Sequence, residues 1–204
     1  QAPDSGNAEI LAHYGSDAQK ERYLQPLLDG KISSCYSMTE PHAGADPTLF
    51  TTSAVKDGDE WVLNGEKWFS SNARFASFFI VMAVTNPDVN AYEGMSMFIV
   101  PAETPGVNII RNTGIGSEPE GEGSHAYMHY DNVRLTDDNL LGDPGSAFAI
   151  AQVRLGARAD HGLDAAGQCL RLGREEPGVQ RGAGLFGIPT AFHGSIRGGR
   201  QGGQ

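Results

Sequence analysis

The sequence predicts an α+β architecture in which an antiparallel β-barrel or sandwich is flanked by α-helices. Strand-like apolar runs follow one another from residue 34 to about residue 141. No helical pattern of about 10 to 15 residues separates them, which argues against a parallel α/β sheet. On both sides of this segment, at residues 8–29 and 147–173, apolar residues recur at helical spacing instead.

The first helical segment is interrupted at Gly15, so we expect two short helices there. Ile10, Leu11 and Tyr14 share one face of the helix before the interruption. Ser16 is a typical N-cap for the helix that follows.

The strands are inferred from apolar runs that end at turn residues. Residues 51–55 and 61–63 flank Asp57 and Gly58, a pair that favours a hairpin turn. The central segment is therefore an all-β domain of roughly 110 residues. Further strands are expected at residues 78–84, 95–100, 107–110 and 126–133.

Composition excludes several classes of protein. With 39% hydrophobic and 8% aromatic residues among 204, the chain can bury a core and is not disordered as a whole. A net charge of −10 opposes binding to nucleic acid or to an anionic membrane surface. The longest apolar run, residues 78–84, is too short to span a bilayer, so no membrane insertion is expected. Two cysteines, Cys35 and Cys169, cannot form a disulfide framework, which indicates a reducing compartment.

Glycine is enriched toward the C-terminus. The chain has 27 glycines, and 10 of them lie in the last 32 residues. Each glycine costs a helix about 1 kcal/mol relative to alanine, and Pro177 costs about 3 kcal/mol. We therefore expect the C-terminal helix to break near residue 173 and the tail to be irregular.

Three other patterns carry little functional signal. The glycines in GIGSEPEGEG, at residues 114–123, lack the spacing of a phosphate-binding loop. The acidic stretch at 118–122 is interpreted as a solvated loop, and His125 and His129 as two ordinary strand histidines. No metal site is expected, because cysteine and histidine do not cluster at ligand spacing.

Two motifs carry the functional signal, CYSMTEPHAGAD at residues 35–46 and NGEKWFSSN at residues 64–72. Together they resemble the acyl-CoA dehydrogenase family, whose signatures are an aromatic residue with Thr-Glu-Pro and Asp, and a later NGxKxWITN. The resemblance spans about residues 6–197. Further segments that look like the family are YGSDAQKERYLQPLLDGK, PAETPGVNII, DNVRL, GSAFAIAQVRLG and FGIPTAFHGSIR.

This resemblance implies a multidomain fragment. Residues 1–33 would be the end of an N-terminal α-helical domain, and residues 34–143 a complete middle β domain. Residues 144–204 would be the truncated and degenerate start of a C-terminal α-helical domain. The family's carboxylate base is expected beyond the end of this chain, so no catalytic residue is assigned and the chain alone should be poorly active.

The resemblance also implies an FAD-dependent enzyme of fatty acid metabolism, as in β-oxidation. A carboxylate base removes the acyl α-proton while the β-hydrogen leaves as hydride to FAD, which converts the acyl-CoA to the 2-enoyl-CoA. Two alternatives stay open: a non-catalytic fragment that binds flavin or acyl-CoA, and a related flavin oxidase or monooxygenase.

The partners that the resemblance implies are an acyl-CoA substrate and an electron-transfer flavoprotein or another acceptor. Family members are homo-oligomers, so further copies of the chain are also candidate partners. Bacterial cytoplasm and mitochondrial matrix both suit a reducing, acidic chain.

Six residues match the family's cofactor-binding positions. The three from the first motif correspond to positions that line the isoalloxazine ring through backbone amides and a hydroxyl. In the second motif, Phe69 corresponds to the aromatic residue that packs on the flavin, with Trp68 as the alternative one place earlier. Ser71 corresponds to the hydroxyl near flavin N5. The full set is Tyr36, Met38, Thr39, Trp68, Phe69 and Ser71.

Other positions concern the substrate or depart from the family. Ala45 stands where many relatives have a serine that touches the acyl-CoA. Arg158 corresponds to an arginine near the CoA portion, with an exposed helix arginine as the equal alternative. Ala183 replaces an arginine that contacts the FAD of a neighbouring subunit. Glu40 and Asp46 are interpreted as turn carboxylates that cap backbone amides.

Overall fold

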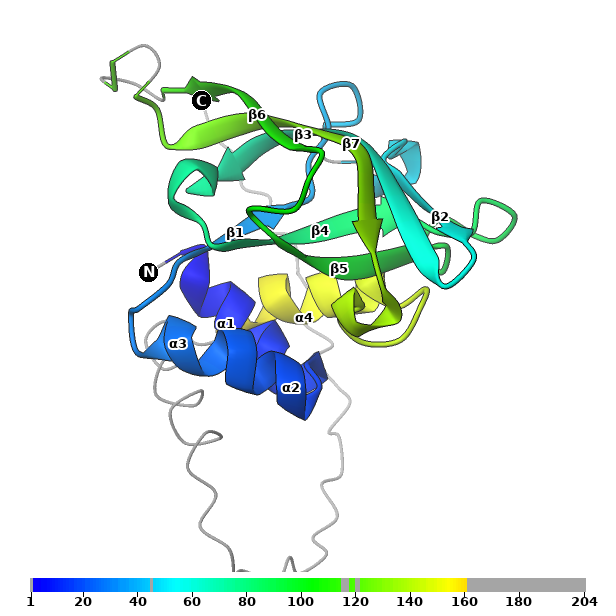
Figure 1. Ribbon diagram of the computed structural model, residues 1–204, viewed down its shortest axis with the longest axis horizontal. Helices are drawn as coiled ribbons and strands as arrows, with labels where there is room; N and C mark the ends of the chain where they lie inside the picture. Colours follow the sequence, from blue (N-terminus) through cyan, green and yellow to red (C-terminus); the bar gives the residue numbers. More distant parts are fainter. Residues whose placement is uncertain (1, 45, 115–117, 120–121, 161–204) are drawn as a thin grey trace, which may run out of the picture. The chain divides into compact units, whose positions relative to one another are not determined.

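The computed structural model describes residues 2–44, 46–114, 118–119 and 122–160, and it gives the order helices, strands, helix (Figure 1). The helices are α1 (Asp4–Tyr14), α2 (Asp17–Gln19), α3 (Gln25–Leu28) and α4 (Ala147–Asp160). The strands are β1 (Ser34–Ser37), β2 (Ser53–Asp57), β3 (Glu60–Ser71), β4 (Phe78–Val84), β5 (Met95–Pro101), β6 (Val107–Thr113) and β7 (His125–Leu135). Single 3-10 turns lie at Pro47–Leu49, Ala73–Phe75 and Asp137–Asn139.

The N-terminal helices form as their local sequence predicts. Helix α1 ends at Gly15, whose N–H donates to the carbonyl of Leu11. Ser16 then caps α2: its hydroxyl accepts from the backbone N–H of Gln19, and the Gln19 side chain accepts from the Ser16 N–H. A π-helical turn at Lys20–Leu24 joins α2 to α3. No helix in the described ranges has the length and the apolar character needed to cross a membrane.

The seven strands form one curved sheet in the order β1-β4-β2-β3-β7-β6, with β5 on the other edge of β4. The predicted hairpin is confirmed, since β2 pairs antiparallel with β3 across a turn at Gly58, where φ is +64°. The pairs β3–β7, β4–β5 and β6–β7 are also antiparallel. The predicted α+β class with a barrel-like β domain is therefore confirmed.

The pairing is nevertheless mixed rather than wholly antiparallel. β4 runs parallel to β1 along residues 34–37 and meets β2 in parallel at the single pair Ser53 and Val84. These contacts join strands far apart in the sequence, and hairpin signals describe only neighbours along the chain. β4 is buried on both faces from Phe78 to Ala83, as a central strand with layers on both sides should be.

Alternation along β4 divides the core into two clusters. Phe78, Ile80 and Met82 pack with side chains of α1, α3 and α4, which lie beneath β1, β4 and β5 in Figure 1. Phe79 and Val81 face the interior of the curved sheet, where β3 and β7 supply further apolar side chains. Strand β1 thus lies between the helical layer and the sheet interior, and the pocket described below opens at its end.

Several sequence predictions lie outside the described residues. The C-terminal helix is described only to Asp160, so the expected break near residue 173 and the departure at Ala183 are not reached. The boundaries between the three expected domains also stay predictions.

Candidate functional site

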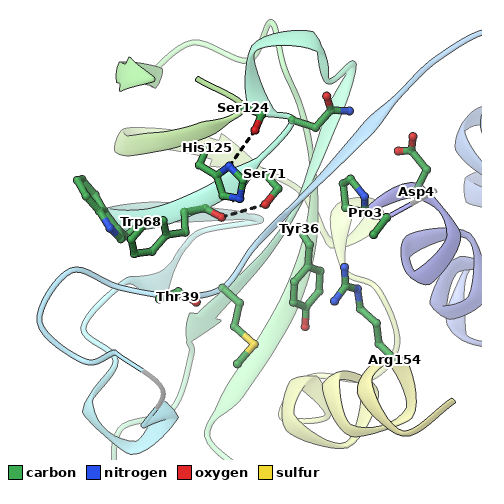
Figure 2. Close-up of a pocket in the computed structure, with 13 residues that line it drawn as sticks. Pro3, Asp4, Tyr36, Thr39, Trp68, Ser71, Ser124, His125 and Arg154 are labelled. Atoms are coloured by element: carbon green, nitrogen blue, oxygen red, sulfur yellow. Dashed lines mark hydrogen bonds between the residues drawn. The ribbon is translucent and has the colours of Figure 1, made fainter. Parts of the chain in front are cut away.

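A cavity of about 660 Å³ lies where the C-terminal ends of β1 and β3 and the start of β7 meet α1 and α4 (Figure 2). All six residues predicted to bind the cofactor line it, although they come from two separate motifs. The residues that line the cavity are Ala2, Pro3, Asp4, Tyr36, Met38, Thr39, Trp68, Phe69, Ser71, Asn72, Ser124, His125 and Arg154.

The segment that follows β1 is held against β3 by two consecutive carbonyls. The ammonium of Lys67 donates to the carbonyl of Met38 over 2.8 Å. The backbone N–H of Trp68 donates to the carbonyl of Thr39 over 2.7 Å. This part of the cavity wall is therefore fixed by one side-chain donor, Lys67, and by one backbone donor, the N–H of Trp68.

The aromatic part of the wall results from a β-bulge in β3. Lys67 pairs with Met128 and Ser70 with Ala126, so Trp68 and Phe69 together face a single β7 residue. Phe69 takes the left-handed backbone conformation, with φ at +51°, which is costly for a residue with a Cβ. Phe69 is 48% exposed, so the bulge presents an open aromatic ring at the cavity.

The neighbouring Trp68 is packed on several sides. Its ring lies 5.1 Å from the ring of Tyr127 and 5.2 Å from that of Phe69, centroid to centroid. The guanidinium of Arg111 lies 5.0 Å from its centroid. Both aromatic residues line the cavity, and the more exposed Phe69 is better placed to receive a planar ligand.

Polar side chains from the end of β3 and from the start of β7, with Ser124 just before it, complete the barrel side of the cavity. Ser71 lies opposite His125 in the sheet, and its hydroxyl makes a long contact, 3.4 Å, to the carbonyl of Phe69. The hydroxyl of Ser124 lies 3.0 Å from Nδ1 of His125. Sequence reasoning treated His125 as an ordinary strand histidine; its position in the cavity follows from the register, which the sequence alone did not reveal.

The helical side of the cavity depends on Arg154, which sequence reasoning missed. It is 8% exposed, its Nε donates to Oδ1 of Asn7, and its guanidinium carbon lies 3.8 Å from the ring centroid of Tyr36 (Figure 2). Asn7 donates in turn to the hydroxyl of Ser34, and Asp4 accepts from the Ser34 hydroxyl and N–H. The sequence does contain a signal for this residue. Arg154 is a charged residue three positions after Ala151, on the helix face that otherwise carries apolar residues.

The hydroxyl of Tyr36 is buried and has no hydrogen-bond partner in the described part of the chain. Burial raises the pKa of Tyr36 to about 12, although the charge of Arg154 acts in the opposite direction. The phenol therefore stays neutral and keeps both its donor and its acceptor capacity.

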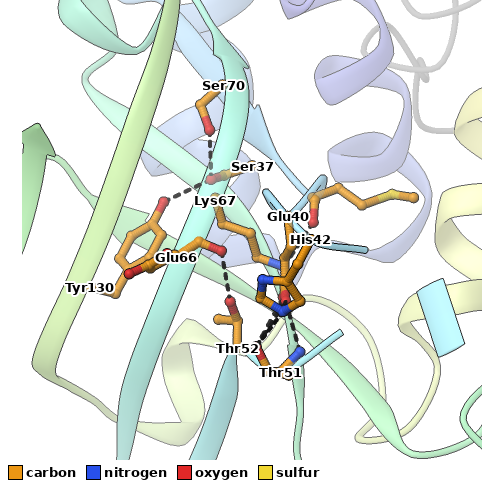
Figure 3. A network of polar contacts seen from close by, with 10 residues as sticks. Ser37, Glu40, His42, Thr51, Thr52, Glu66, Lys67, Ser70 and Tyr130 are labelled. Carbon is orange, nitrogen blue, oxygen red and sulfur yellow. Dashed lines mark hydrogen bonds and ion pairs between the residues drawn. The ribbon is translucent and has the colours of Figure 1, made fainter. Parts of the chain in front are cut away.

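Beneath the barrel side, Glu40 caps the turn that precedes β2, as the sequence predicts. Its two carboxylate oxygens accept from the backbone N–H groups of Thr51 and Thr52, over 2.7 Å and 3.0 Å. Glu40 also forms an ion pair with Lys67 that was not expected (Figure 3). Asp46 similarly accepts from the backbone N–H of Thr48, which confirms its predicted role.

Neither residue predicted to contact the substrate is placed. Ala45 lies outside the described residues, and for Arg158 only the backbone, in α4, is described. Within the described ranges, no group of three or more His, Cys, Asp or Glu side chains is arranged to hold a metal ion.

Comparisons with known proteins agree on one family. Residues 35–133 match the acyl-CoA dehydrogenase middle domain. The chain is 43% identical over 200 residues to the probable acyl-CoA dehydrogenase FadE2 of Mycobacterium tuberculosis, covering 96% of this chain and 49% of that protein. It is 45% identical over 166 residues to acyl-CoA dehydrogenase family member 11 of Gallus gallus, covering 79% of this chain and 21% of that protein. The chain therefore spans about half of one relative and about a fifth of the other.

Solved structures give the same result. A putative acyl-CoA dehydrogenase from Mycobacterium abscessus is 40% identical, with a TM-score of 0.72 over 83% of this chain and 41% of that one. An FAD complex of PigA is 28% identical, with a TM-score of 0.67 over 74% of this chain and 39% of that one. Fold, motifs and relatives agree, and this chain belongs to the acyl-CoA dehydrogenase family.

Proposed function

We propose that this chain supplies the flavin-contacting wall of an FAD-dependent acyl-CoA dehydrogenase, which converts an acyl-CoA to the 2-enoyl-CoA. One observation carries the proposal. Two motifs, at residues 36–39 and 68–71, contribute six predicted flavin contacts, and all six line a single cavity. If the two motifs had independent roles, their residues would not need to line the same cavity.

The residues present fit a flavin. A flat ring system with polar edges needs an open aromatic or apolar face and hydrogen-bond donors at its rim. Phe69 offers the exposed ring, while Thr39 and Ser71 offer hydroxyls on the same cavity. The PigA structure, which holds FAD, supports the proposal through its similarity to this chain.

When bound, FAD would supply the redox chemistry by accepting the hydride that leaves the β-carbon of the acyl-CoA. The chain's own contribution is to bind and orient. Phe69 and Trp68 would hold the ring plane, the hydroxyls of Thr39 and Ser71 would donate to its polar edge, and the helical side would keep water from the reacting face.

No general base is assigned to this chain. Asp4 is the sole carboxylate among the described residues that line the cavity. Its Oδ1 already accepts two hydrogen bonds from Ser34, which suits a structural role better than proton removal. The residues described here therefore support cofactor binding and orientation, and proton abstraction is not ascribed to any of them.

The first experiment is an FAD titration of the purified chain, followed by flavin absorbance and fluorescence. Saturable binding is expected; no bound flavin, even with FAD in excess, would refute the proposal. Ser71→Ala should weaken FAD binding without unfolding the β domain, because it removes one donor at the cavity. Ser77→Ala, at an exposed serine next to β4, is the matched control and should leave binding unchanged.

Anaerobic addition of a panel of acyl-CoA thioesters to the FAD-loaded chain tests the reaction. Bleaching of the flavin absorbance by at least one member supports dehydrogenation. Tight FAD binding with no bleaching by any member would favour a non-catalytic flavin-binding domain instead.

A further inference from the structure

A buried ion pair joins the two motifs beneath the floor of the cavity. Nζ of Lys67 lies 2.9 Å from Oε1 of Glu40, and the side chains of both residues are fully buried. Glu40 belongs to the Thr-Glu-Pro of the first motif and Lys67 to the NGEK of the second. Neither residue lines the cavity, so the proposed flavin contacts do not explain why they are charged.

Each member of the pair also fixes backbone. Lys67 donates to the carbonyl of Met38 and lies 4.4 Å from the ring centroid of Phe50. Glu40 accepts from the N–H groups of Thr51 and Thr52, as Figure 3 shows. The pair therefore ties the segment after β1 to both β3 and the chain that enters β2.

Burying the ion pair costs free energy, because both charged groups lose their hydration. Burial lowers the pKa of Lys67 to about 8, against the opposing effect of Glu40. Burial also acts to raise the pKa of Glu40, but the charge of Lys67 and the hydrogen bonds from Thr51 and Thr52 bring it below its usual value. Apolar residues of similar volume often stabilise a core at least as well as a buried ion pair. Core packing alone therefore does not explain why Glu40 and Lys67 are charged.

Peptide geometry identifies that role. In a planar trans peptide the carbonyl of one residue and the N–H of the next point in opposite directions. Because Lys67 holds the carbonyl of Met38, it also turns the N–H of Thr39 away from itself. Thr39 lines the cavity, and its own carbonyl is held by the N–H of Trp68.

We propose that Lys67 and Glu40 are positioning residues, which fix the Met38–Thr39 peptide so that the amide and hydroxyl of Thr39 are presented to the flavin. The identity of the ligand as a flavin rests on the proposed function, whereas the orientation of the Met38–Thr39 peptide by Lys67 and Glu40 does not. The two parts can therefore be tested separately on the same full chain.

The test compares the wild-type chain with the double variant Glu40→Gln/Lys67→Met, which removes both charges and leaves neither partner buried alone. Lys56→Met is the matched control, since Lys56 pairs with Asp137 at the surface of the same β domain. Amide hydrogen exchange of Trp68, Thr51 and Thr52 reports the held segment. At least tenfold faster exchange is expected for these amides in the double variant, beyond any change in the slowest core amides, and no change is expected in the control.

The second measurement is the FAD dissociation constant with the visible spectrum of the bound flavin. The double variant should bind FAD at least tenfold more weakly, with a shifted flavin band, because the Thr39 donors are no longer held in place. Unchanged exchange at Trp68 would overturn the positioning role. Unchanged FAD affinity and spectrum, despite faster exchange, would overturn its connection to the flavin.

The outcomes separate this inference from the proposed function. If the wild-type chain binds no FAD, the proposed function fails, and the exchange data alone decide whether the pair orients the peptide. Should the double variant not fold, Glu40→Asp, which keeps both charges but shortens the carboxylate side chain, takes its place in both measurements. That variant is expected to give threefold to tenfold effects, and effects equal to those of Lys56→Met would overturn the proposal.

Discussion

The two sides of the cavity are built by different physical means. The barrel side, formed by the ends of β1 and β3 and the start of β7, is held by backbone hydrogen bonds and by the buried pair Glu40–Lys67. The helical side, formed by the start of α1 and by Arg154, is held to the sheet by side chains. Arg154 contacts Asn7, which contacts Ser34 at the start of β1.

This difference predicts different responses to mutation. Backbone hydrogen bonds survive the loss of most side chains, so the barrel side should lose its shape only when the buried pair is broken. The helical side depends on single side chains, and its loss should open α1 locally while the sheet persists. The rigid barrel side would orient a flat ligand, and the helical side, which opens more easily, would admit a second ligand.

The largest effect is expected when the barrel side is broken by Lys67→Met. The change leaves the Glu40 carboxylate buried without its counter-charge, which costs about 3–5 kcal/mol in comparable cases. Urea denaturation followed by tryptophan fluorescence measures the free energy of unfolding. Lys56→Met at the surface should keep a free energy of unfolding close to that of wild type. A similar loss in both variants would show that the buried pair Glu40–Lys67 contributes no more to stability than the surface pair of Lys56 with Asp137.

A smaller effect is expected when the helical side is broken by Arg154→Ala. The variant loses a hydrogen bond to Asn7 and the stacking on Tyr36, together about 2 kcal/mol. Amide exchange should accelerate in α1 and leave the amides of β3 and β7 unchanged. Arg74→Ala, at an exposed arginine next to β3, is the control; uniform acceleration throughout the sheet would show that the two sides are not independent.

Acid should weaken the barrel side through Glu40. Its pKa in the folded chain is lower than its usual value of 4.5, so the unfolded chain takes up more protons as the pH falls. The stability that the carboxylate contributes is thus present above about pH 4.5 and is lost as the pH drops through its folded pKa. Urea denaturation of wild type and Glu40→Gln at several pH values should show a difference near pH 6 that shrinks by about 1–2 kcal/mol toward pH 3, as the carboxylate loses its charge. A difference in the free energy of unfolding that does not change with pH would contradict this pH dependence.

The smallest change in stability is expected for Phe69→Gly. Glycine relieves the positive φ, worth about 1 kcal/mol, and offsets the loss of ring contacts to Trp68 and His125. The free energy of unfolding should therefore change by less than about 1 kcal/mol. FAD affinity should fall at least tenfold, measured by flavin fluorescence, because the exposed ring is gone. A large loss of stability would show that Phe69 serves the fold rather than a ligand.

The barrel side was largely predictable from the sequence, because its motifs are local. The hairpin turn at Gly58 and the strand at Phe78–Val84 follow from runs of a few residues each, and the six cavity residues follow from the resemblance of two short motifs to a family. The resemblance to a family then indicated that the two motifs belong to one site.

The rest depends on contacts between distant segments, which local patterns do not encode. The ion pair joins residues 40 and 67, and the hydrogen bond of Arg154 reaches Asn7 across 147 positions. The bulge at Trp68 and Phe69 likewise arises from the register with β7. Each of these features needs a partner strand or helix whose place the sequence pattern did not specify.

The most direct test of a flavin site on the barrel side is a titration of the isotope-labelled chain with FAD, followed by amide NMR shifts. The largest shifts should fall at Thr39, Phe69 and Ser71, and they should saturate together. Residues around the smaller cavity of about 180 Å³ near Phe50 and Met95 should show only minor shifts. Saturating shifts at that second cavity, with none at Thr39, Phe69 and Ser71, would contradict the account.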